Sequence, residues 1–241
     1  MDSPQIIYED DFVLALCKPA GMLVHKPRLN PEKAAFQSSE TLTEWVLKRY
    51  PEVSKVGDNT EERAGIVHRL DRETSGVILI AKTQEAFEFI KKQFQEREIK
   101  KQYLTLVNGV LKGRGLINKP IGLKPGTVKR TVRAKNMKMV KEAVTEYEAI
   151  ENFDRATLVR VKPHTGRTHQ IRVHLLSIGF PVVGDSLYGG TKRETFGLKR
   201  QFLHAESLEF LSPNGRRVRV EADLPVELQS VLDDLRANKL E

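Results

Sequence analysis

Short apolar runs recur along the whole chain and are separated by residues that favour turns. Runs of this length, bounded by Gly, Pro, Asn or Asp, are typical of β-strands. The last two runs flank Ser212-Pro-Asn-Gly215, which favours a hairpin because Asn-Gly accepts positive φ at little cost. The expected strands are Ile6–Tyr8, Val13–Lys18, Ile66–Leu70, Val77–Ala81, Tyr103–Asn108, Ala143–Glu151, Thr157–Lys162, Leu203–Phe210 and Arg216–Glu221.

Helical periodicity is confined to fewer segments. It predicts helices over Leu42–Tyr50, Gln84–Glu98, His169–Ile178 and Pro225–Ala237. The first of these is preceded by Thr41-x-x-Glu44, the pattern of a capping box. Because strands outnumber helices and several neighbouring strands can pair as hairpins, the pattern predicts an α+β fold with a mixed, mainly antiparallel sheet.

Charge and cysteine content narrow the setting of the protein. The 241 residues carry a formal net charge of +8, which favours a polyanionic partner without identifying one. Cys17 is the single cysteine, so an internal disulfide is impossible and a reducing, cytoplasmic setting is expected. No run approaches the roughly 18 apolar residues of a membrane span, and the N-terminus lacks the pattern of a secretory signal.

Polar residues crowd Gly65–Gly76 between two apolar runs. Asp71 lies between Arg69 and Arg72, and nearby positive charge favours the ionised form of a carboxylate. An ionised aspartate in such a turn can act as a nucleophile or a general base. By local physics alone, a polar turn with a structural ion pair explains the same residues.

Three histidines accompany Pro163–Leu175. His169 and His174 are five residues apart, which is the wrong spacing for two metal ligands one helical turn apart. His164 adds no convincing third ligand, because no carboxylate or cysteine accompanies it. Core or phosphate-contacting histidines are therefore favoured over a metal site.

Two further segments are rich in turn residues or positive charge. Lys18-Pro-Ala-Gly21 is typical of a tight turn after a strand, and Gly113-Arg-Gly115 of a loop. The run Lys129–Lys141 fits a solvated face and a loop that tracks phosphates about equally well.

Taken together, these segments resemble the RluA-type family of pseudouridine synthases. The resemblance extends from about residue 6 to residue 221, and the order of its blocks is highly specific. The matching blocks are Lys18-Pro-Ala-Gly21, His68-Arg-Leu-Asp-Arg-Glu-Thr-Ser-Gly76, Lys101-Gln-Tyr103 with Gly109, Lys119-Pro-Ile-Gly122, Thr165-Gly-Arg-Thr-His-Gln-Ile-Arg-Val-His174, Gly184-Asp-Ser-Leu-Tyr-Gly189 and Leu203-His-Ala205.

The resemblance implies a fold and a set of functional residues. It implies a long central sheet in two packed halves, flanked by a few helices, with an RNA-binding cleft between the halves. The family's catalytic aspartate falls on Asp71, its base-contacting tyrosine on Tyr103 and the arginine that pairs with the aspartate on Arg172. The residues expected to bind substrate are Arg69, which would help to displace the target nucleotide, Leu203, which would line the pocket, and His68, Arg167 and Lys18.

The implied reaction needs no redox change and no group from outside, so neither cofactor nor metal is expected. The expected partner is structured RNA, either ribosomal or transfer RNA. Residues 1–241 are expected to form a single catalytic domain without a separate N-terminal RNA-binding domain, and to work as a monomer. Contacts with RNA would then rest on the catalytic domain, including the loop-like segments Arg28–Leu42 and Val53–Arg63.

Two alternatives remain open from the sequence. The first is an RNA-binding or chaperone module that keeps the scaffold without chemistry, against which the intact Asp71, Tyr103 and Arg172 argue. The second, a metal-dependent hydrolase using the histidines, is the weaker.

Overall fold

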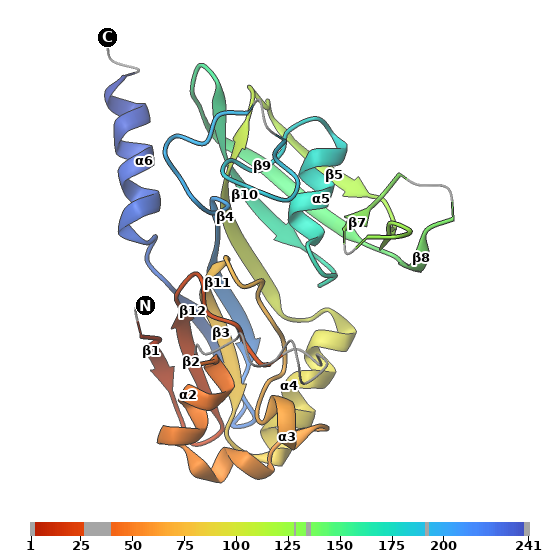
Figure 1. The fold of residues 1–241 in the computed structure, drawn as a ribbon. Coiled ribbons are helices and arrows are strands. Elements are labelled where there is room, and N and C mark those ends of the chain that lie inside the picture. The colour runs from red at the N-terminus through yellow and green to blue at the C-terminus, as the bar shows by residue number, and fades with distance from the viewer. Residues whose placement is uncertain (1–2, 27–39, 128, 134–135, 191–192, 239–241) are drawn as a thin grey trace. The chain divides into compact units, whose positions relative to one another are not determined.

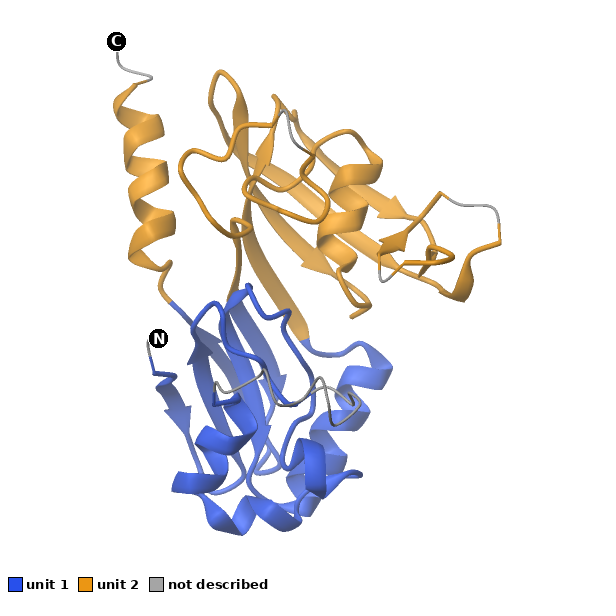
Figure 2. Ribbon diagram, viewed as in Figure 1, with its two compact units in different colours: residues 1–99, 207–222 blue, residues 100–206, 223–241 orange. Residues whose placement is uncertain are grey.

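The protein divides into two compact units in a computed structural model that describes residues 3–26, 40–127, 129–133, 136–190 and 193–238. Unit 1 comprises residues 1–99 and 207–222, and unit 2 comprises residues 100–206 and 223–241 (Figure 2). Figure 1 labels the helices and strands of both units.

Unit 1 contains a sheet with the hydrogen-bonded order β1-β2-β3-β11, with β12 also paired to β11. The pairs β1-β2, β2-β3 and β11-β12 are antiparallel. In the register of β2 and β3, Val13 lies opposite Ala81 and Lys18 lies opposite Gly76. The end of β2 therefore lies beside the start of β3, where the segment containing Asp71 joins the sheet. The strands are β1 (Gln5–Glu9), β2 (Val13–Lys18), β3 (Ser75–Ala81), β11 (Leu203–Leu211) and β12 (Arg217–Glu221).

The helices of unit 1 begin where the sequence predicts. Thr41 and Glu44 form the capping box of α2 (Leu42–Arg49), and Thr83 caps α4 (Gln84–Glu96) by accepting a hydrogen bond from the amide of Ala86. Helix α4 contacts β3, of which every residue is buried. Between these helices lie a short 3₁₀ helix, η1 (Pro51–Lys55), and α3 (Thr60–Arg63).

Unit 2 contains a second part of the sheet, in the order β11-β4-β10-β9-β5. Every strand pair in this part for which a register is described is antiparallel. A separate small sheet has the order β7-β6-β8. The strands are β4 (Lys100–Asn108), β5 (Arg114–Asn118), β6 (Ile121–Leu123), β7 (Arg130–Thr131), β8 (Lys138–Lys141), β9 (Val144–Asn152) and β10 (Ala156–Pro163).

Unit 2 buries two apolar clusters that use alternate residues of β4. Leu106 belongs to the cluster formed with α6 (Val226–Ala237), and Val107 to the cluster formed with α5 (Gln170–Ser177). Because successive side chains of a strand point to opposite faces, the two helices cover opposite faces of this part of the sheet (Figure 1).

The structure confirms the predicted α+β class, the mainly antiparallel pairing and the hairpin at residues 212–215. The strand predicted over Ile66–Leu70 is wrong, because only Ile66 forms an isolated bridge, to Ile80. The amide and carbonyl of Gly65 bond to Val56 and Ala81, and the chain then turns into a polar loop.

Several elements were not predicted. Gly113–Gly115 was expected to be a loop, but β5 begins at Arg114. The run Lys129–Lys141 contains β7 and β8, and Val53–Arg63 contains residues of η1 and α3. Most of Arg28–Leu42 lies outside the described residues.

Among the helices of the described residues, none has both the length and the apolar character that a membrane crossing requires.

Candidate active site

Asp71 lies in a loop of unit 1 whose backbone is hydrogen-bonded by Lys18. The Nζ atom of Lys18 donates hydrogen bonds to the carbonyl oxygens of Pro19, Met22 and Arg72, at 2.8, 3.0 and 3.1 Å. Lys18 is 0% exposed, and the three carbonyl dipoles stabilise its ammonium group inside the protein. This burial departs from the contact with RNA that was predicted for Lys18, and it gives the residue a structural role.

A second contact ties the turn after β2 to the loop. The amide of Gly21 donates to the carbonyl oxygen of Arg72 at 2.9 Å, and Nε of Arg72 donates back to the carbonyl oxygen of Gly21 at 2.9 Å. Gly21 has a φ of +82°, which a residue with a side chain adopts only with strain. Lys18-Pro-Ala-Gly21 is therefore the support of the Asp71 loop. The half-buried Asp71 also accepts a hydrogen bond at its backbone carbonyl from the amide of Thr74, at 3.1 Å.

His68 and Arg69, the two basic residues that precede Asp71, differ in exposure. His68 accepts a hydrogen bond at Nε2 from the amide of Leu79, at 2.9 Å, and its ring lies 4.7 Å from the ring of Phe94. A ring nitrogen that accepts carries no proton, so the neutral imidazole of His68 bears its proton on Nδ1. Arg69 is exposed. Of the two, Arg69 is the more exposed to solvent.

Arg172 lies on α5 in unit 2 and makes a two-pronged ion pair with Asp185. Its Nε and Nη2 donate to the two carboxylate oxygens at 2.7 and 2.8 Å, and the two side chains are 6% and 0% exposed. One of those oxygens also accepts from the amides of Leu187 and Tyr188, at 2.9 and 3.0 Å. These contacts fix both the charge and the direction of the guanidinium group.

Tyr188 completes the surroundings of Arg172. The guanidinium carbon of Arg172 lies 5.0 Å from the centre of the Tyr188 ring. The Tyr188 hydroxyl accepts from the amide of Arg130 at 2.9 Å and lies 2.9 Å from Nδ1 of His169. The segment Gly184–Gly189 thus supplies both the carboxylate and the aromatic ring that contact the guanidinium group of Arg172.

Gln170 anchors the start of α5 to the sheet. Its Oε1 accepts from the hydroxyl of Thr165 at 2.7 Å and from the amide of Arg167 at 2.9 Å. Its Nε2 donates to the carbonyl oxygen of Val144 and to the hydroxyl of Thr145, both at 2.9 Å. All four hydrogen-bonding positions of this buried amide are therefore used.

His174 anchors the next turn of the helix. It lies between the Thr145 hydroxyl, 2.8 Å from Nδ1, and the Lys119 carbonyl oxygen, 2.9 Å from Nε2. Because a carbonyl only accepts, the proton of the neutral ring is on Nε2. Burial lowers the pKa of His174, so folding favours the neutral form of this ring.

The histidines do not converge on a metal site. His169 contacts Tyr188, His174 contacts Thr145 and Lys119, and Nε2 of His164 lies 3.4 Å from Glu146. In the part of the chain that the structure describes, no group of three potential ligands among His, Cys, Asp and Glu is found.

Tyr103 and Leu203 come together in unit 2. The half-buried Tyr103 lies on β4 and packs against the apolar cluster that contains Leu203 and Ile171, which precedes Arg172. Leu203 is 4% exposed. Tyr103 thus packs against the same buried apolar cluster that contains Leu203.

The predicted site residues therefore fall into two groups. Unit 1 holds Asp71, His68, Arg69 and Lys18, and unit 2 holds Tyr103, Arg172, Leu203 and Arg167.

Sequence reasoning gave no role to the residues that hold these groups. Asp185, Tyr188 and Gln170 were part of the matching blocks, but nothing in the sequence indicates that Asp185 pairs with Arg172, thirteen positions earlier. The ordered polar block Gly184–Gly189 was the only signal.

Comparison with known proteins places the chain among enzymes that modify RNA. The family model described as RNA pseudouridylate synthase matches residues 12–177. The ribosomal large subunit pseudouridine synthase D of Xanthomonas campestris is 40% identical over 96% of this chain and 69% of its own length. An uncharacterized RNA pseudouridine synthase of Chloroflexus aurantiacus is 41% identical over 91% of this chain and 65% of its own length. Among solved structures, human RNA pseudouridylate synthase domain containing 1 has a TM-score of 0.74 and 26% identity, with 95% of this chain and 87% of that chain covered.

Proposed function

The chain belongs to the RNA pseudouridylate synthase family, whose members isomerise uridine to pseudouridine in RNA, and we propose that its own substrate is ribosomal RNA of the large subunit. The substrate is inferred from the printed names of several relatives that are 36 to 40% identical to this chain. The net charge of +8 supports a polyanionic substrate.

The observation that carries the proposal is the construction of the Asp71 loop. Lys18 and Gly21 bind the backbone of this loop at Arg72, one residue after Asp71. These contacts fix the main chain next to Asp71, so the loop presents its side chain from a supported backbone. We propose Asp71 as the catalytic residue, which either attacks C1′ of the target uridine or removes its 2′ proton.

Both roles of Asp71 require an ionised carboxylate, and Arg172 is proposed to stabilise that charge. The two bonds to Asp185 engage Nε and Nη2 of Arg172 and hold its guanidinium group in one orientation. A guanidinium held in this way stays charged and cannot rotate away during the reaction.

The other site residues are assigned to the target nucleotide. The bond from N1 to C1′ breaks, the uracil rotates, and C5 bonds to C1′; the proton on C5 is lost to solvent and N1 is protonated. Tyr103 and Leu203 are proposed to hold the detached uracil against their apolar surface. The exposed Arg69 is proposed to occupy the space that the nucleotide leaves when it flips out of its stack.

We also propose that both units together form one catalytic domain, because each holds part of the candidate site. We propose that this domain acts as a monomer in the cytoplasm. Transfer RNA is the second candidate substrate.

The test is to treat unmodified transcripts of large-subunit ribosomal RNA and of transfer RNA with the purified protein and to map pseudouridine in each. The proposal predicts pseudouridine at specific positions of the ribosomal transcript. Product in transfer RNA alone would overturn the substrate, and absence of product in both would overturn the function.

A further inference from the structure

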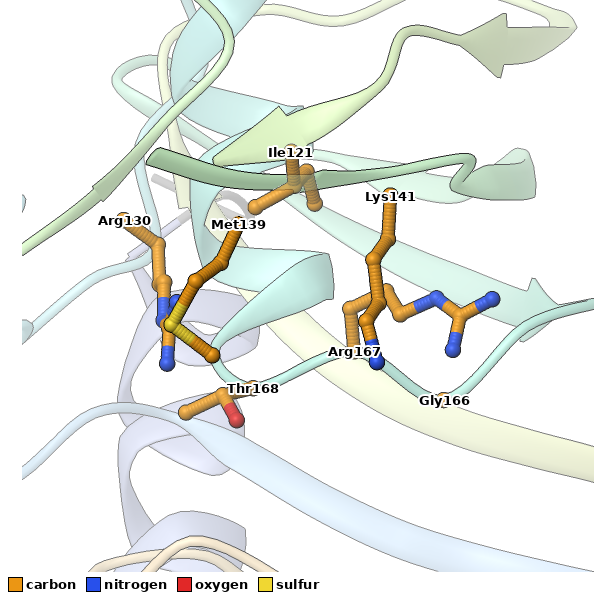
Figure 3. A pocket seen from close by; sticks show the side chains of 7 residues that line it. All are labelled: Ile121, Arg130, Met139, Lys141, Gly166, Arg167 and Thr168. Atoms are coloured by element: carbon orange, nitrogen blue, oxygen red, sulfur yellow. The ribbon is translucent and has the colours of Figure 1, made fainter. Parts of the chain in front are cut away.

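A pocket of unit 2 lies between the small sheet β7-β6-β8 and the loop that leads into α5. It has a volume of about 210 Å³. Figure 3 shows Arg130 and Lys141 reaching from β7 and β8 toward the loop at residues 166–168. The seven described residues that line the pocket are Ile121, Arg130, Met139, Lys141, Gly166, Arg167 and Thr168.

The charge of the lining has one sign. Three of the seven lining residues, Arg130, Lys141 and Arg167, are cationic and none is acidic. Among the described residues, the side chains of Arg130 and Lys141 make no ion pair that would neutralise them, and Nε of Arg167 donates to the backbone oxygen of Glu142 at 2.9 Å. Three cations around one small hollow repel each other unless an anion enters it.

The two arginines are held in place through their backbones. The amide of Arg130 donates to the Tyr188 hydroxyl, and the amide of Arg167 donates to Oε1 of Gln170. Tyr188 also contacts the guanidinium group of Arg172. The pocket is thus built on the same residues that position Arg172, which distinguishes it from a chance cluster of surface charges.

Gly166 supplies an independent sign that a ligand approaches this loop. It does not have the positive φ that explains Gly113 (φ +69°) and Gly126 (φ +70°), and a Cβ added to it would meet nothing within 4 Å. Neither backbone strain nor packing therefore requires glycine here. Gly166 and Thr168 are exposed, so an anion could come close to the main chain here, beside the hydroxyl of Thr168.

We propose that this pocket holds one phosphate group of the RNA strand, away from the reacting nucleotide, and so sets the register of the RNA relative to Arg172. The ligand class is a phosphodiester, because phosphate oxygens match two arginines, a lysine and a hydroxyl at once. The proposal rests on the RNA substrate proposed above.

The test compares binding of an unmodified large-subunit ribosomal RNA transcript to variants over a range of salt concentrations. Arg130→Ala, Lys141→Ala and Arg167→Ala should each raise Kd about 5- to 10-fold and lower the slope of log Kd against log salt by about 1. If the three cations share one phosphate, the triple variant loses little more slope than a single variant, because residues in one contact are not additive. A loss of about 3 in slope would show separate contacts and overturn the shared site.

The matched control removes the same charge elsewhere on unit 2. Lys112, Arg114 and Lys199 are exposed and do not line the pocket, so their triple replacement by Ala should raise Kd by less than the triple variant of the pocket. Equal losses in the two triple variants would reduce the pocket to general electrostatics and overturn the proposal.

Gly166→Ala tests the close approach without removing charge. The change should leave the thermal unfolding midpoint unchanged or slightly raised, since no strain or clash is added, while Kd for RNA rises about 3-fold or more. Unchanged Kd would contradict the approach of phosphate to this loop. Binding is measured without turnover, so the subsite can fail while the wild-type protein forms pseudouridine, and it can stand while the wild-type protein forms none.

Discussion

The two units support their charged site residues in different ways. In unit 1 Lys18 and the amide of Gly21 both donate to the backbone carbonyl oxygen of Arg72, next to Asp71. In unit 2 the contacts end on the side chain itself, because Asp185 holds the guanidinium group of Arg172. A loop held by its main chain presents a short carboxylate, whereas a long, flexible arginine must be held at its tip to be aimed.

The difference predicts that damage to the support has a different outcome in each unit. In unit 2 the loss of the supporting carboxylate leaves a buried positive charge without its anion, which mainly lowers the free energy of unfolding. In unit 1 damage to the support loosens the loop, which costs activity in proportion to the loss of position.

The largest loss of stability is expected from Asp185→Asn. It leaves the charge of Arg172 buried without its anion, and such a loss costs about 3 to 5 kcal/mol of unfolding free energy. The measurement is urea unfolding. Glu194→Gln, which removes the carboxylate from the exposed pair with Arg155, is the control and should change the free energy by no more than about 1 kcal/mol. Equal losses in both variants would remove the distinction between the two supports.

Lys18→Met should cost less stability, about 3 kcal/mol, because three carbonyl oxygens in a buried site lose their shared donor while the apolar stem is kept. It should also lower the rate of pseudouridine formation by a larger factor than it weakens RNA binding. Lys92→Met, at a lysine that is 70% exposed, is the matched control. It should alter neither the unfolding free energy nor the rate of pseudouridine formation. A Lys18 variant that loses binding but keeps its full rate would contradict the structural role and restore the predicted contact with RNA.

A smaller effect is expected from the protonation of His174. Its pKa is lowered in the folded state by burial, so the unfolded chain takes up a proton that the folded one does not. Stability is therefore present above the unfolded pKa of about 6.5 and falls as the pH drops below it, by at most about 1.4 kcal/mol per pH unit. Urea unfolding at about pH 7.5 and pH 5.5 should show a drop that is smaller in His174→Gln than in the wild type. The same drop in both would show that His174 is not the group responsible.

The smallest effect concerns helix α2 of unit 1. Thr41→Ala removes the side chain that accepts from the amide of Glu44 and should cost about 1 kcal/mol of unfolding free energy. Catalysis should be unchanged, because the cap does not contact the Asp71 loop. A loss of activity beyond the loss of stability would link α2 to the site and weaken the assignment of loop support to Lys18 and Gly21.

The sequence predicted the elements that local chemistry determines. The box of Thr41 with Glu44, the hairpin at Asn214-Gly215 and the strand ending at Lys18 all depend on residues close in the chain. The strand predicted over Ile66–Leu70 is wrong because an apolar run does not by itself form a strand, and only Ile66 pairs with another strand. The predicted cleft between two halves stays a prediction.

The sequence nominates the charged groups of the candidate site, which stay predictions, but not the residues that support them. Asp71 and Arg172 stand out in distinctive blocks, while the use of Lys18 inside the protein depends on the register that brings it beside Gly76. The pairing of Arg172 with Asp185 depends on how residues 184–189 turn back to α5, which no local pattern encodes.

The central claim is that the loop presents Asp71 for catalysis, and Asp71→Asn tests it most directly. The assay is release of tritium from carbon 5 of labelled uridine in ribosomal RNA, measured with RNA affinity and unfolding free energy. Glu73→Gln makes the same change of carboxylate to amide two residues further along the loop and is the matched control. The account predicts no tritium release from the Asp71 variant, with its fold and RNA binding retained and the Glu73 variant active. Full tritium release from Asp71→Asn would contradict the account.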